Sequence, residues 1–441
     1  MNKFRAFVSR NAICGTRLAP HCFVRRILVI ATLTLALLSG AALAADASLE
    51  AGGEALQKGD LAAATKIYQQ ITTARPKSAD AEKAWVNLGV IALTGAHWAE
   101  GVHCYEQALA INPKDSKALN GKATALLSLG QTDEAGKVWN EALAANPRDI
   151  ETLSNLGKLA MRLDDYDKAE KLFTAARSAD PGNAEPHIGL AEIALVKGNA
   201  KTAIVESRAA LRLVPDHPAA LACLGEALIQ NGENSAAVEP LKKSIAQSPL
   251  RPEIHLQLAI ALYNSGRFAD AGLALADAVD LTPDDPRIHL YAGLCYYQLE
   301  DPNADTEFDH ALKLGVLGHD RAVALYHKGL LRDDAKQLDK AEPLYKDAEK
   351  ADPKYAPPAN NLGLVFQRTD RLMEAAIEFR RALGANPDYD AARLNLGHVL
   401  ILMGQNQQAK SELEKLRSLP AGTELRERAE EMLAQIKNPV P

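Results

Sequence analysis

Residues 84–113 read AWVNLGVIALTGAHWAEGVHCYEQALAINP, and this stretch decides the fold. Apolar residues such as Trp85 and Leu88 recur at the spacing of an amphipathic helix, and Gly95 then marks a turn. A second apolar stripe follows the turn, and Pro113 stops it from continuing as a helix. The stretch predicts two short helices joined by a tight turn.

The proline that ends this stretch recurs along the chain at a nearly constant interval. The prolines that keep the interval are Pro76, Pro113, Pro147, Pro181, Pro215, Pro249, Pro283, Pro353 and Pro387. Five successive intervals are 34 residues long, and the interval of 70 residues is two periods plus two residues. A fixed period near 34 residues predicts a repeat array rather than separate globular domains. Because one helical hairpin cannot bury its own apolar face, each unit needs the next one.

The composition is typical of helices and narrows the class of partner. Hydrophobic residues make up 47% of the 441 residues and aromatic residues only 5%, which excludes a wholly disordered chain. Residues 1–44 contain six Lys and Arg and no acid, so the remainder holds 44 basic and 56 acidic residues, a net charge of −12. Since nucleic acids are bound mainly through Lys and Arg, we expect no nucleic-acid partner.

Residues 1–44 have the pattern of a signal peptide. A basic region ends at Arg26, the apolar segment ILVIATLTLALL covers residues 27–38, and Ala42 and Ala44 supply small residues for cleavage. We therefore expect export to the periplasm, or secretion, with cleavage after Ala44. Because the apolar segment and its C-terminal flank carry no charge, an uncleaved inner-membrane anchor is the alternative, and only that form would contact a membrane.

The repeat resembles the tetratricopeptide repeat (TPR) family. The family pattern places Leu-Gly in the first helix, Ala and an aromatic residue in the second, and then a later Ala and Pro. Two units that follow it are Leu156-Gly157, Ala169, Phe173, Ala176, Pro181 and Leu362-Gly363, Ala375, Phe379, Ala382, Pro387. About eleven such units cover residues 48–421. The resemblance implies an all-α protein, a right-handed α-solenoid of tandem helix-turn-helix repeats.

Two segments depart from the regular array of residues 45–421. The unit near residues 284–318 has lost one residue in its turn, at Asp301-Pro302-Asn303, and lacks the terminal proline. We expect the superhelix to bend or change pitch there. In the final segment, residues 422–441, the stretch TELRERAEEMLAQIK (423–437) sets one apolar stripe among many charges. It predicts a polar capping helix that closes the stack, followed by a loose tail.

No motif indicates catalysis, a cofactor or a metal. No two histidines lie three or four residues apart, and the chain lacks H-E-x-x-H, C-x-x-C, G-x-G-x-x-G and a phosphate-binding Lys loop. Acid pairs such as Asp164-Asp165, Asp284-Asp285 and Asp333-Asp334 lie near expected turns, where Asp caps helices. Cys104, Cys223 and Cys295 have no motif spacing, and we expect them to be small buried apolar residues. We therefore expect a non-enzymatic protein without cofactor or bound metal.

The resemblance implies that a protein or peptide segment binds in the concave groove lined by the first helices. Positions on that face correspond here to Asn87, Asn120, Asn155, Tyr263, Tyr291, Tyr297, Tyr326, His327, Asn360, Asn361, Arg368, Asn395 and His398. An Asn amide can both donate to and accept from an extended backbone. The alternative is that some Asn residues satisfy neighbouring helix ends. The Lys, Arg and Asn set with which one TPR subgroup clamps a C-terminal carboxylate is absent, whereas the recurrent Asn is similar to the ladder in the repeat arm of O-linked sugar transferases.

Within that face, residues 253–334 predict the strongest contact patch. They hold Tyr263, Tyr291, Tyr297 and Tyr326, and tyrosine is a rigid amphipathic residue enriched at interfaces. The alternative is that some of these rings, above all Tyr297, pack between repeats.

Two classes of function fit this reading. The first is an envelope scaffold that holds components of a secretion, pilus or polysaccharide-export assembly. The second is a periplasmic substrate chaperone, or a regulatory arm for a separately encoded enzyme. Stable stoichiometric complexes would favour the scaffold, and many transient clients would favour the chaperone.

Overall fold

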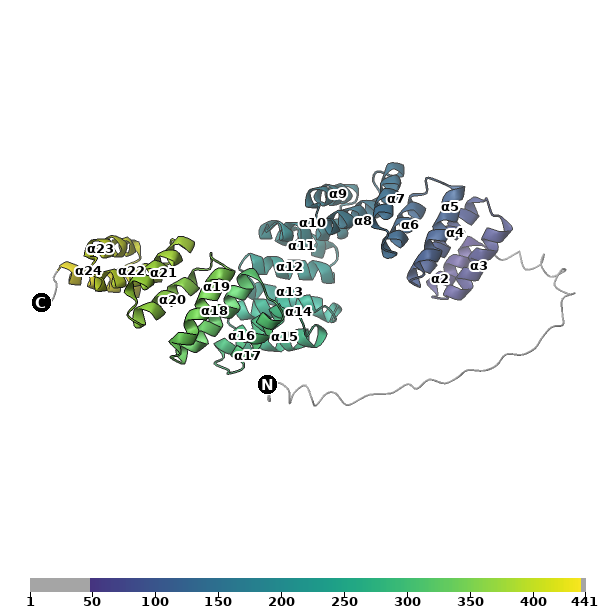
Figure 1. Ribbon diagram of the computed structural model, residues 1–441. Coiled ribbons are helices and arrows are strands. Elements are labelled where there is room, and N and C mark those ends of the chain that lie inside the picture. Colours follow the sequence, from purple (N-terminus) through teal and green to yellow (C-terminus); the bar gives the residue numbers. More distant parts are fainter. Residues whose placement is uncertain (1–47, 438–441) are drawn as a thin grey trace, which may run out of the picture. The chain divides into compact units, whose positions relative to one another are not determined.

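The computed structural model describes residues 48–437, and all regular secondary structure in that range is helical. The signal peptide predicted for residues 1–44 lies outside the described residues. The helices form hairpins that follow one another along the chain (Figure 1), and the chain divides into two compact units. Unit 1 extends to Asn231, and unit 2 begins at Gly232.

In unit 1, first and second helices alternate, and neighbours in sequence pack against each other. First helices of successive repeats also touch, as α4 and α6 do. The helices are α2 (Leu49–Gln57), α3 (Leu61–Ala74), α4 (Ala79–Thr94), α5 (Trp98–Ile111), α6 (Ser116–Ser128), α7 (Thr132–Ala145), α8 (Ile150–Arg162), α9 (Tyr166–Ala179), α10 (Glu185–Val196), α11 (Ala200–Leu213) and α12 (Pro218–Gln230). Even-numbered helices are the first helices of their repeats.

Unit 2 continues the same alternation. Its helices are α13 (Asn234–Gln247), α14 (Pro252–Asn264), α15 (Phe268–Leu281), α16 (Pro286–Gln298), α17 (Ala304–Lys313), α18 (Gly318–Asp334), α19 (Leu338–Ala351), α20 (Ala356–Arg368), α21 (Leu372–Ala385), α22 (Asp390–Leu402), α23 (Asn406–Lys415), a short 3₁₀ helix (Leu416–Ser418) and α24 (Glu424–Lys437). None of the helices within residues 48–437 is both long and apolar enough to cross a membrane.

Short polar residues begin many of the helices, and left-handed residues close many of the turns. Asp149 Oδ2 accepts a hydrogen bond from the backbone N–H of Thr152 at the start of α8. Gly130 and other turn glycines have a positive φ, which glycine adopts without steric cost. The turn after α4 differs from the sequence-based expectation, because Ala96 and not Gly95 is the left-handed residue there.

The core is a series of small clusters along the array. One cluster joins α6, α7 and α8 through buried side chains that include Leu126, Trp139 and Leu156. Another joins α18 to α22 around Tyr345 and Phe379. Each cluster draws on adjacent hairpins, as expected when every unit buries its apolar face against the next.

The two irregular segments of the sequence are irregular in the structure. In the degenerate unit, α17 has 10 residues, where the second helices of the neighbouring repeats, α15 and α19, have 14. Gly315 in the connection to α18 and Gly318 at the start of α18 both have positive φ. At the end of the array, α24 contacts α22 and α23. Leu433 of α24 and Leu413 of α23 are buried in one cluster, so α24 covers the last hairpin.

The remaining candidates for chemistry have structural surroundings. Cys104, Cys223 and Cys295 are buried and form no disulfide, as the sequence predicts. Asp165 caps α9 by accepting from the backbone N–H of Lys168, as expected of an acid beside a turn. Asp333 lies in the last turn of α18, where its carboxylate binds Arg368.

Candidate partner-binding surface

The four tyrosines of the predicted patch lie on three consecutive first helices of unit 2. We call Tyr263, Tyr291, Tyr297 and Tyr326 the tyrosine face. Tyr263 lies near the C-terminal end of α14, the next two lie on α16, and Tyr326 lies on α18. The rings of Tyr263 and Tyr291 meet edge to face, with centroids 6.1 Å apart and planes at 78°. The patch therefore crosses from one repeat to the next.

His327 joins the other two rings of the tyrosine face. Its ring centroid lies 5.2 Å from that of Tyr297 and 5.2 Å from that of Tyr326, edge to face in both cases. The imidazole also stacks on Phe308, at 5.6 Å. Tyr326 in turn contacts Tyr355, which precedes α20, at 5.6 Å. A row of rings thus connects α16, α18 and the start of α20.

The tyrosine face is partly buried. Each ring packs one side against a core cluster, and part of the side chain stays accessible. Burial raises the pKa of all four phenols above the ordinary value near 10, most strongly for Tyr326. The phenols therefore stay protonated at neutral pH and can donate hydrogen bonds. These rings therefore pack between repeats and also keep part of their surface accessible.

Asparagines of unit 2 link neighbouring first helices. Asn395 of α22 donates through Nδ2 to Oδ1 of Asn360 on α20, at 3.0 Å. Asn360 donates to Oδ1 of Asn361 at 3.1 Å, and Nδ2 of Asn361 lies 3.5 Å from the Tyr326 hydroxyl on α18. The contacts of Asn395 with Asn360 and of Asn361 with Tyr326 join side chains of adjacent repeats, whereas the Asn360–Asn361 bond lies within α20. The bonds of Asn395 use its amide nitrogen, and its carbonyl oxygen is the atom a partner backbone could meet.

Unit 1 holds a similar but more enclosed arrangement. The buried Asn120 accepts at Oδ1 from Nε1 of Trp139, at 2.8 Å, and from Nδ2 of Asn155, at 3.0 Å. Burial raises the pKa of Tyr68, a ring in the core of the first hairpins, and the Asn87 side chain partly opposes that rise. Asn87 and Asn155 belong to unit 1, whereas the tyrosine face belongs to unit 2.

Arg368 is already engaged by a carboxylate. Its two terminal nitrogens bind both oxygens of Asp333, each at 2.6 Å, and so tie α20 to α18. The Asp333 carboxylate raises the pKa of the Arg368 guanidinium. One repeat further, Gln367 of α20 lies 3.0 Å from Nδ1 of His398 on α22. These contacts make the first helices α18, α20 and α22 one continuous polar and aromatic face.

Two clusters in unit 2 were not predicted from sequence. Lys328 is buried at a position where most repeats have Leu, and its Nζ binds Asp305 at 2.6 Å and Asp309 at 2.9 Å, both on α17. The one feature of the sequence that could have indicated this cluster is a Lys directly before the repeat glycine Gly329. The second cluster is formed by His289, Glu307 and His310. Its ligands come from two helices, α16 and α17, so no spacing within one helix indicates it.

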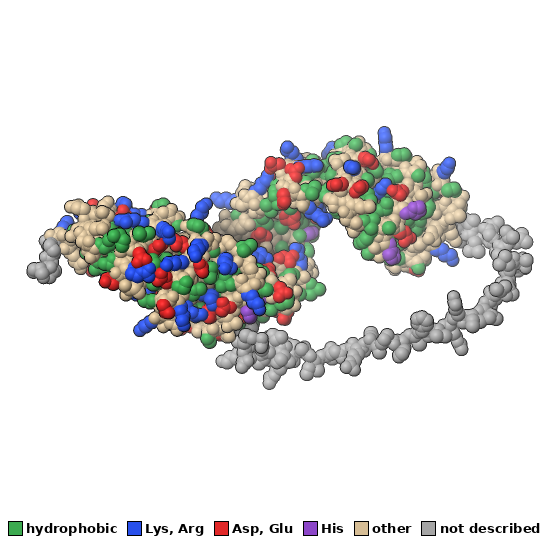
Figure 2. Space-filling view, in the orientation of Figure 1, with side chains coloured by type: hydrophobic (Ala, Val, Ile, Leu, Met, Phe, Trp, Pro, Cys, Tyr) green, Lys and Arg blue, Asp and Glu red, His purple; other side chains and the backbone are tan. Residues whose placement is uncertain are grey.

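On the face drawn in Figure 2, neither acidic nor basic side chains gather into one large patch. Figure 2 shows acidic and basic side chains interspersed over the visible face of both units, with apolar side chains between them.

Comparison with known families identifies the repeat. Models of the tetratricopeptide repeat match residues 104–137, residues 160–206 and 235–294, and residues 208–252. These segments fall on the hairpins from α5 to α16. The chain is a tetratricopeptide repeat protein. A comparison with curated proteins finds no match.

Solved structures that are similar to this chain match it at low sequence identity. A chain of the APC/C hetero-tetramer Cut9-Hcn1 is 12% identical, with a TM-score of 0.50, over 88% of this chain and 95% of that one. Yeast Tom70 is 14% identical, with a TM-score of 0.43, over 90% and 96%. A TPR protein from Parabacteroides merdae is 20% identical, with a TM-score of 0.43, over 56% and 96%. The first of these likenesses shows the same all-α solenoid fold, and TPR arrays are protein-interaction scaffolds.

Proposed function

We propose that this TPR protein binds an extended segment of a partner protein across the first helices α14 to α22 of unit 2. The single observation that carries the proposal is the tyrosine face, four partly exposed rings on three successive first helices. Tyrosine offers a large contact area at low entropic cost together with a hydroxyl for directional bonds. The Asn395 carbonyl oxygen at the far end of the face could accept from the partner's backbone.

The proposed role is non-enzymatic and belongs to the bacterial cell envelope. TPR arrays generally act by holding proteins together, which supports a scaffold rather than a catalyst. The signal-peptide pattern of residues 1–44 supports export to the periplasm, where a secretion, pilus or polysaccharide-export assembly would supply the partner. N-terminal sequencing of the exported protein should begin at Ala45. Recovery of intact residues 1–44 in the membrane fraction would contradict export with cleavage.

The test of binding uses a tagged copy crosslinked in intact cells, followed by mass spectrometry of the captured proteins. Partners found with the wild type are then measured against Tyr291→Ala and Tyr263→Ala, with Tyr166→Ala as the control. Tyr166 lies on α9, a second helix of unit 1. Truncating a hot-spot tyrosine should weaken binding by about 1–3 kcal/mol, whereas the control should bind as the wild type does. Circular dichroism shows that each variant is folded.

Two outcomes decide between scaffold and chaperone, and one rejects the site. A few partners in fixed stoichiometry support the scaffold, and many substoichiometric clients would replace it with the chaperone. If the folded tyrosine variants keep every partner at unchanged affinity, the tyrosine face is not the binding surface.

A further inference from the structure

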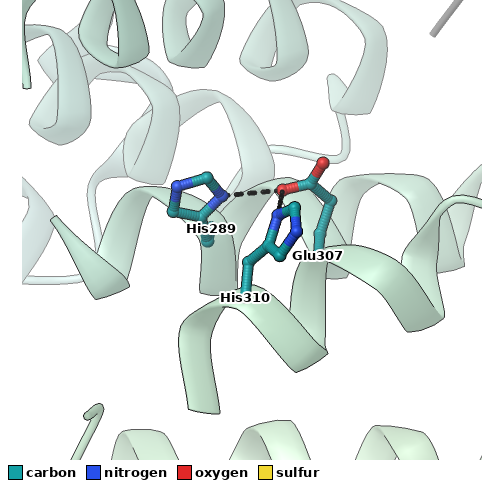
Figure 3. A group of neighbouring side chains, drawn as sticks. All are labelled: His289, Glu307 and His310. Carbon is teal, nitrogen blue, oxygen red and sulfur yellow. Dashed lines mark hydrogen bonds and ion pairs between the residues drawn. The ribbon is translucent and has the colours of Figure 1, made fainter. Parts of the chain in front are cut away.

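Three potential ligand atoms converge between the two helices of the degenerate unit. Figure 3 shows His289 on α16 and Glu307 and His310 on α17, with both rings turned toward the carboxylate. Nδ1 of His289 lies 2.8 Å from Oε2 of Glu307, and Nδ1 of His310 lies 3.9 Å from the same oxygen. The three atoms all lie within 4.8 Å of one another. This group lies outside the tyrosine face and has no part in the proposed binding of a segment.

The donor set is that of a transition-metal site. Two imidazole nitrogens and one carboxylate oxygen are ligands that zinc takes in proteins, usually with water in the fourth position. With zinc–ligand bonds of about 2.0–2.1 Å in a tetrahedron, neighbouring ligand atoms stand about 3.3 Å apart. The observed separations of 2.8 and 3.9 Å lie on either side of that value. Because the His310 side chain is 52% exposed, it can rotate toward the carboxylate without disturbing the core.

A second contact orients the His289 ring for ligation. Its Nε2 lies 2.9 Å from the carbonyl oxygen of Pro283, which can only accept, so Nε2 carries the hydrogen. Metal-binding histidines commonly donate their other ring N–H to a backbone carbonyl in this way. Nδ1 is thereby directed at Glu307, and in the absence of metal a proton holds these two atoms together.

Other repeats show which member of the group is special. His187 and Glu206 pair across α10 and α11 at 2.6 Å, and Arg393 and Glu412 pair across α22 and α23 at 3.0 Å. Since Arg393 cannot ligate a metal, such a pair alone is a structural link between the two helices of a hairpin. The residue three positions after the acid is Ala209 in one case and Lys415 in the other. Only the degenerate unit has a histidine, His310, at this position, and it supplies the third ligand.

We propose that His289, Glu307 and His310 bind one Zn²⁺ ion, which ties α16 to α17 in the degenerate unit. The proposal departs from the sequence-based expectation that the protein binds no metal. That expectation rests on ligand spacings within single helices, whereas these three ligands come from two helices. Ca²⁺ and Mg²⁺ are poor occupants, because both prefer all-oxygen ligation. The bound ion would replace the proton between His289 and Glu307.

The test measures Zn²⁺ binding to the full chain after treatment with a chelator and its removal. Equilibrium dialysis against Zn²⁺ gives the stoichiometry, and the absorption spectrum of a Co²⁺-loaded sample reports tetrahedral ligation. We expect one Zn²⁺ per wild-type chain and no displacement by excess Ca²⁺ or Mg²⁺. His310→Ala changes an exposed side chain and should keep the fold, yet weaken binding by at least the roughly 10–100-fold that a lost outer-shell contact costs.

Matched variants separate this site from adventitious binding to surface histidines. His187→Ala breaks the equivalent two-residue link in unit 1 and should leave Zn²⁺ stoichiometry and affinity unchanged. Zn²⁺ should raise the thermal midpoint of the wild type and of His187→Ala, but not that of His310→Ala. If the wild type binds no Zn²⁺, or if His310→Ala binds it with wild-type affinity and spectrum, the site does not exist.

Discussion

At the residue scale, contacts between glycines and aromatic rings set the spacing of the two helices in several of the hairpins. A Cβ added to Gly363 on α20 would lie 2.6 Å from the ring of Phe379 on α21. Gly157 and Phe173 repeat this relation in unit 1, at 2.9 Å. The rings are fully buried and cannot move aside. The glycine of the Leu-Gly pair and the aromatic residue therefore recur with the 34-residue period because the two residues are in direct contact.

This contact predicts the effect of adding one methyl group. Gly363→Ala should lower the free energy of unfolding by about 1–3 kcal/mol, because the new Cβ overpacks against Phe379. The control is Gly384→Ala in the last turn of α21, where a Cβ would meet nothing within 4 Å. That change should be neutral or stabilising by up to about 1 kcal/mol, since Ala favours helix. Equal urea midpoints for the two variants would contradict the argument.

His327 gives the fold a defined dependence on pH. Burial among Tyr297, Tyr326 and Phe308 lowers the pKa of His327 below its ordinary value near 6.5. The unfolded chain therefore takes up this proton more readily than the folded chain. The stability that neutral His327 confers is present above pH 6.5 and is lost as the pH falls toward the folded-state pKa.

The measurement is urea unfolding of the wild type and of His327→Phe between about pH 7.5 and about pH 5.5. The wild type should lose more stability on acidification than the variant, with the difference at most about 1.4 kcal/mol per pH unit, the slope of one proton. The variant keeps an aromatic ring in the same place and thus serves as the packing control. An identical pH dependence of the two proteins would show that His327 does not titrate as argued.

At the element scale, the 34-residue period predicted the hairpins, and the charged stretch after Pro420 predicted the helix α24. The shortened turn at Asp301-Pro302-Asn303 likewise predicted an irregular hairpin, where α17 is short. The ionic cluster of Lys328 could not be predicted, because its acids lie on the preceding second helix and no local pattern pairs them. Ion pairs between different helices depend on which side chains the helix packing brings together. The 34-residue period predicts that the helices pack, but it does not predict which side chains meet.

The Lys328 cluster is expected to respond asymmetrically to substitution. Asp305 accepts from Lys328 and from Arg332, and both cations hold the pKa of its carboxyl below the ordinary value despite burial. Asp305→Asn should destabilise the protein by about 1–2 kcal/mol, because the buried ammonium keeps only Asp309. Lys328→Leu restores the residue found in most repeats and should stay within about 1 kcal/mol of the wild type.

Chemical denaturation of both variants checks this asymmetry. The loss in Asp305→Asn should be largest at neutral pH and shrink in acid, because the wild-type carboxyl loses its own contribution as the pH falls through its lowered pKa. A larger loss in Lys328→Leu than in Asp305→Asn would mean that packing of the Lys stem, not charge, dominates at this position.

At the scale of the whole molecule, each described repeat packs only against the repeats next to it. The free energy of local opening should therefore differ along the array. The core consists of clusters that each join adjacent hairpins, and the first hairpin, α2 and α3, has a repeat on one side only among the described residues. Hydrogen exchange should therefore give lower opening free energies for α2 and α3 than for α18 to α20. One uniform opening energy from residue 50 to residue 430 would instead indicate a single cooperative unit.

The candidate binding surface was only partly accessible to sequence reasoning. The 34-residue spacing of Tyr263 and Tyr297 placed both on one face, and the structure has them on successive first helices. The lateral bonds of Asn360, Asn361 and Asn395 were not anticipated, since the period does not tell which amide atoms neighbouring repeats occupy. The sequence predicts that Arg368 is available to a partner, whereas in the structure its guanidinium is bound by Asp333.

The central claim is that a partner segment lies across the first helices of unit 2, and site-specific photocrosslinking tests it most directly. A photoreactive phenylalanine derivative replaces Tyr291 on the first helix α16 and, as the control, the exposed Leu273 on the second helix α15. Irradiation in intact cells should join the partner to position 291 and not to position 273. A partner that still co-purifies but crosslinks only from position 273 would contradict the account.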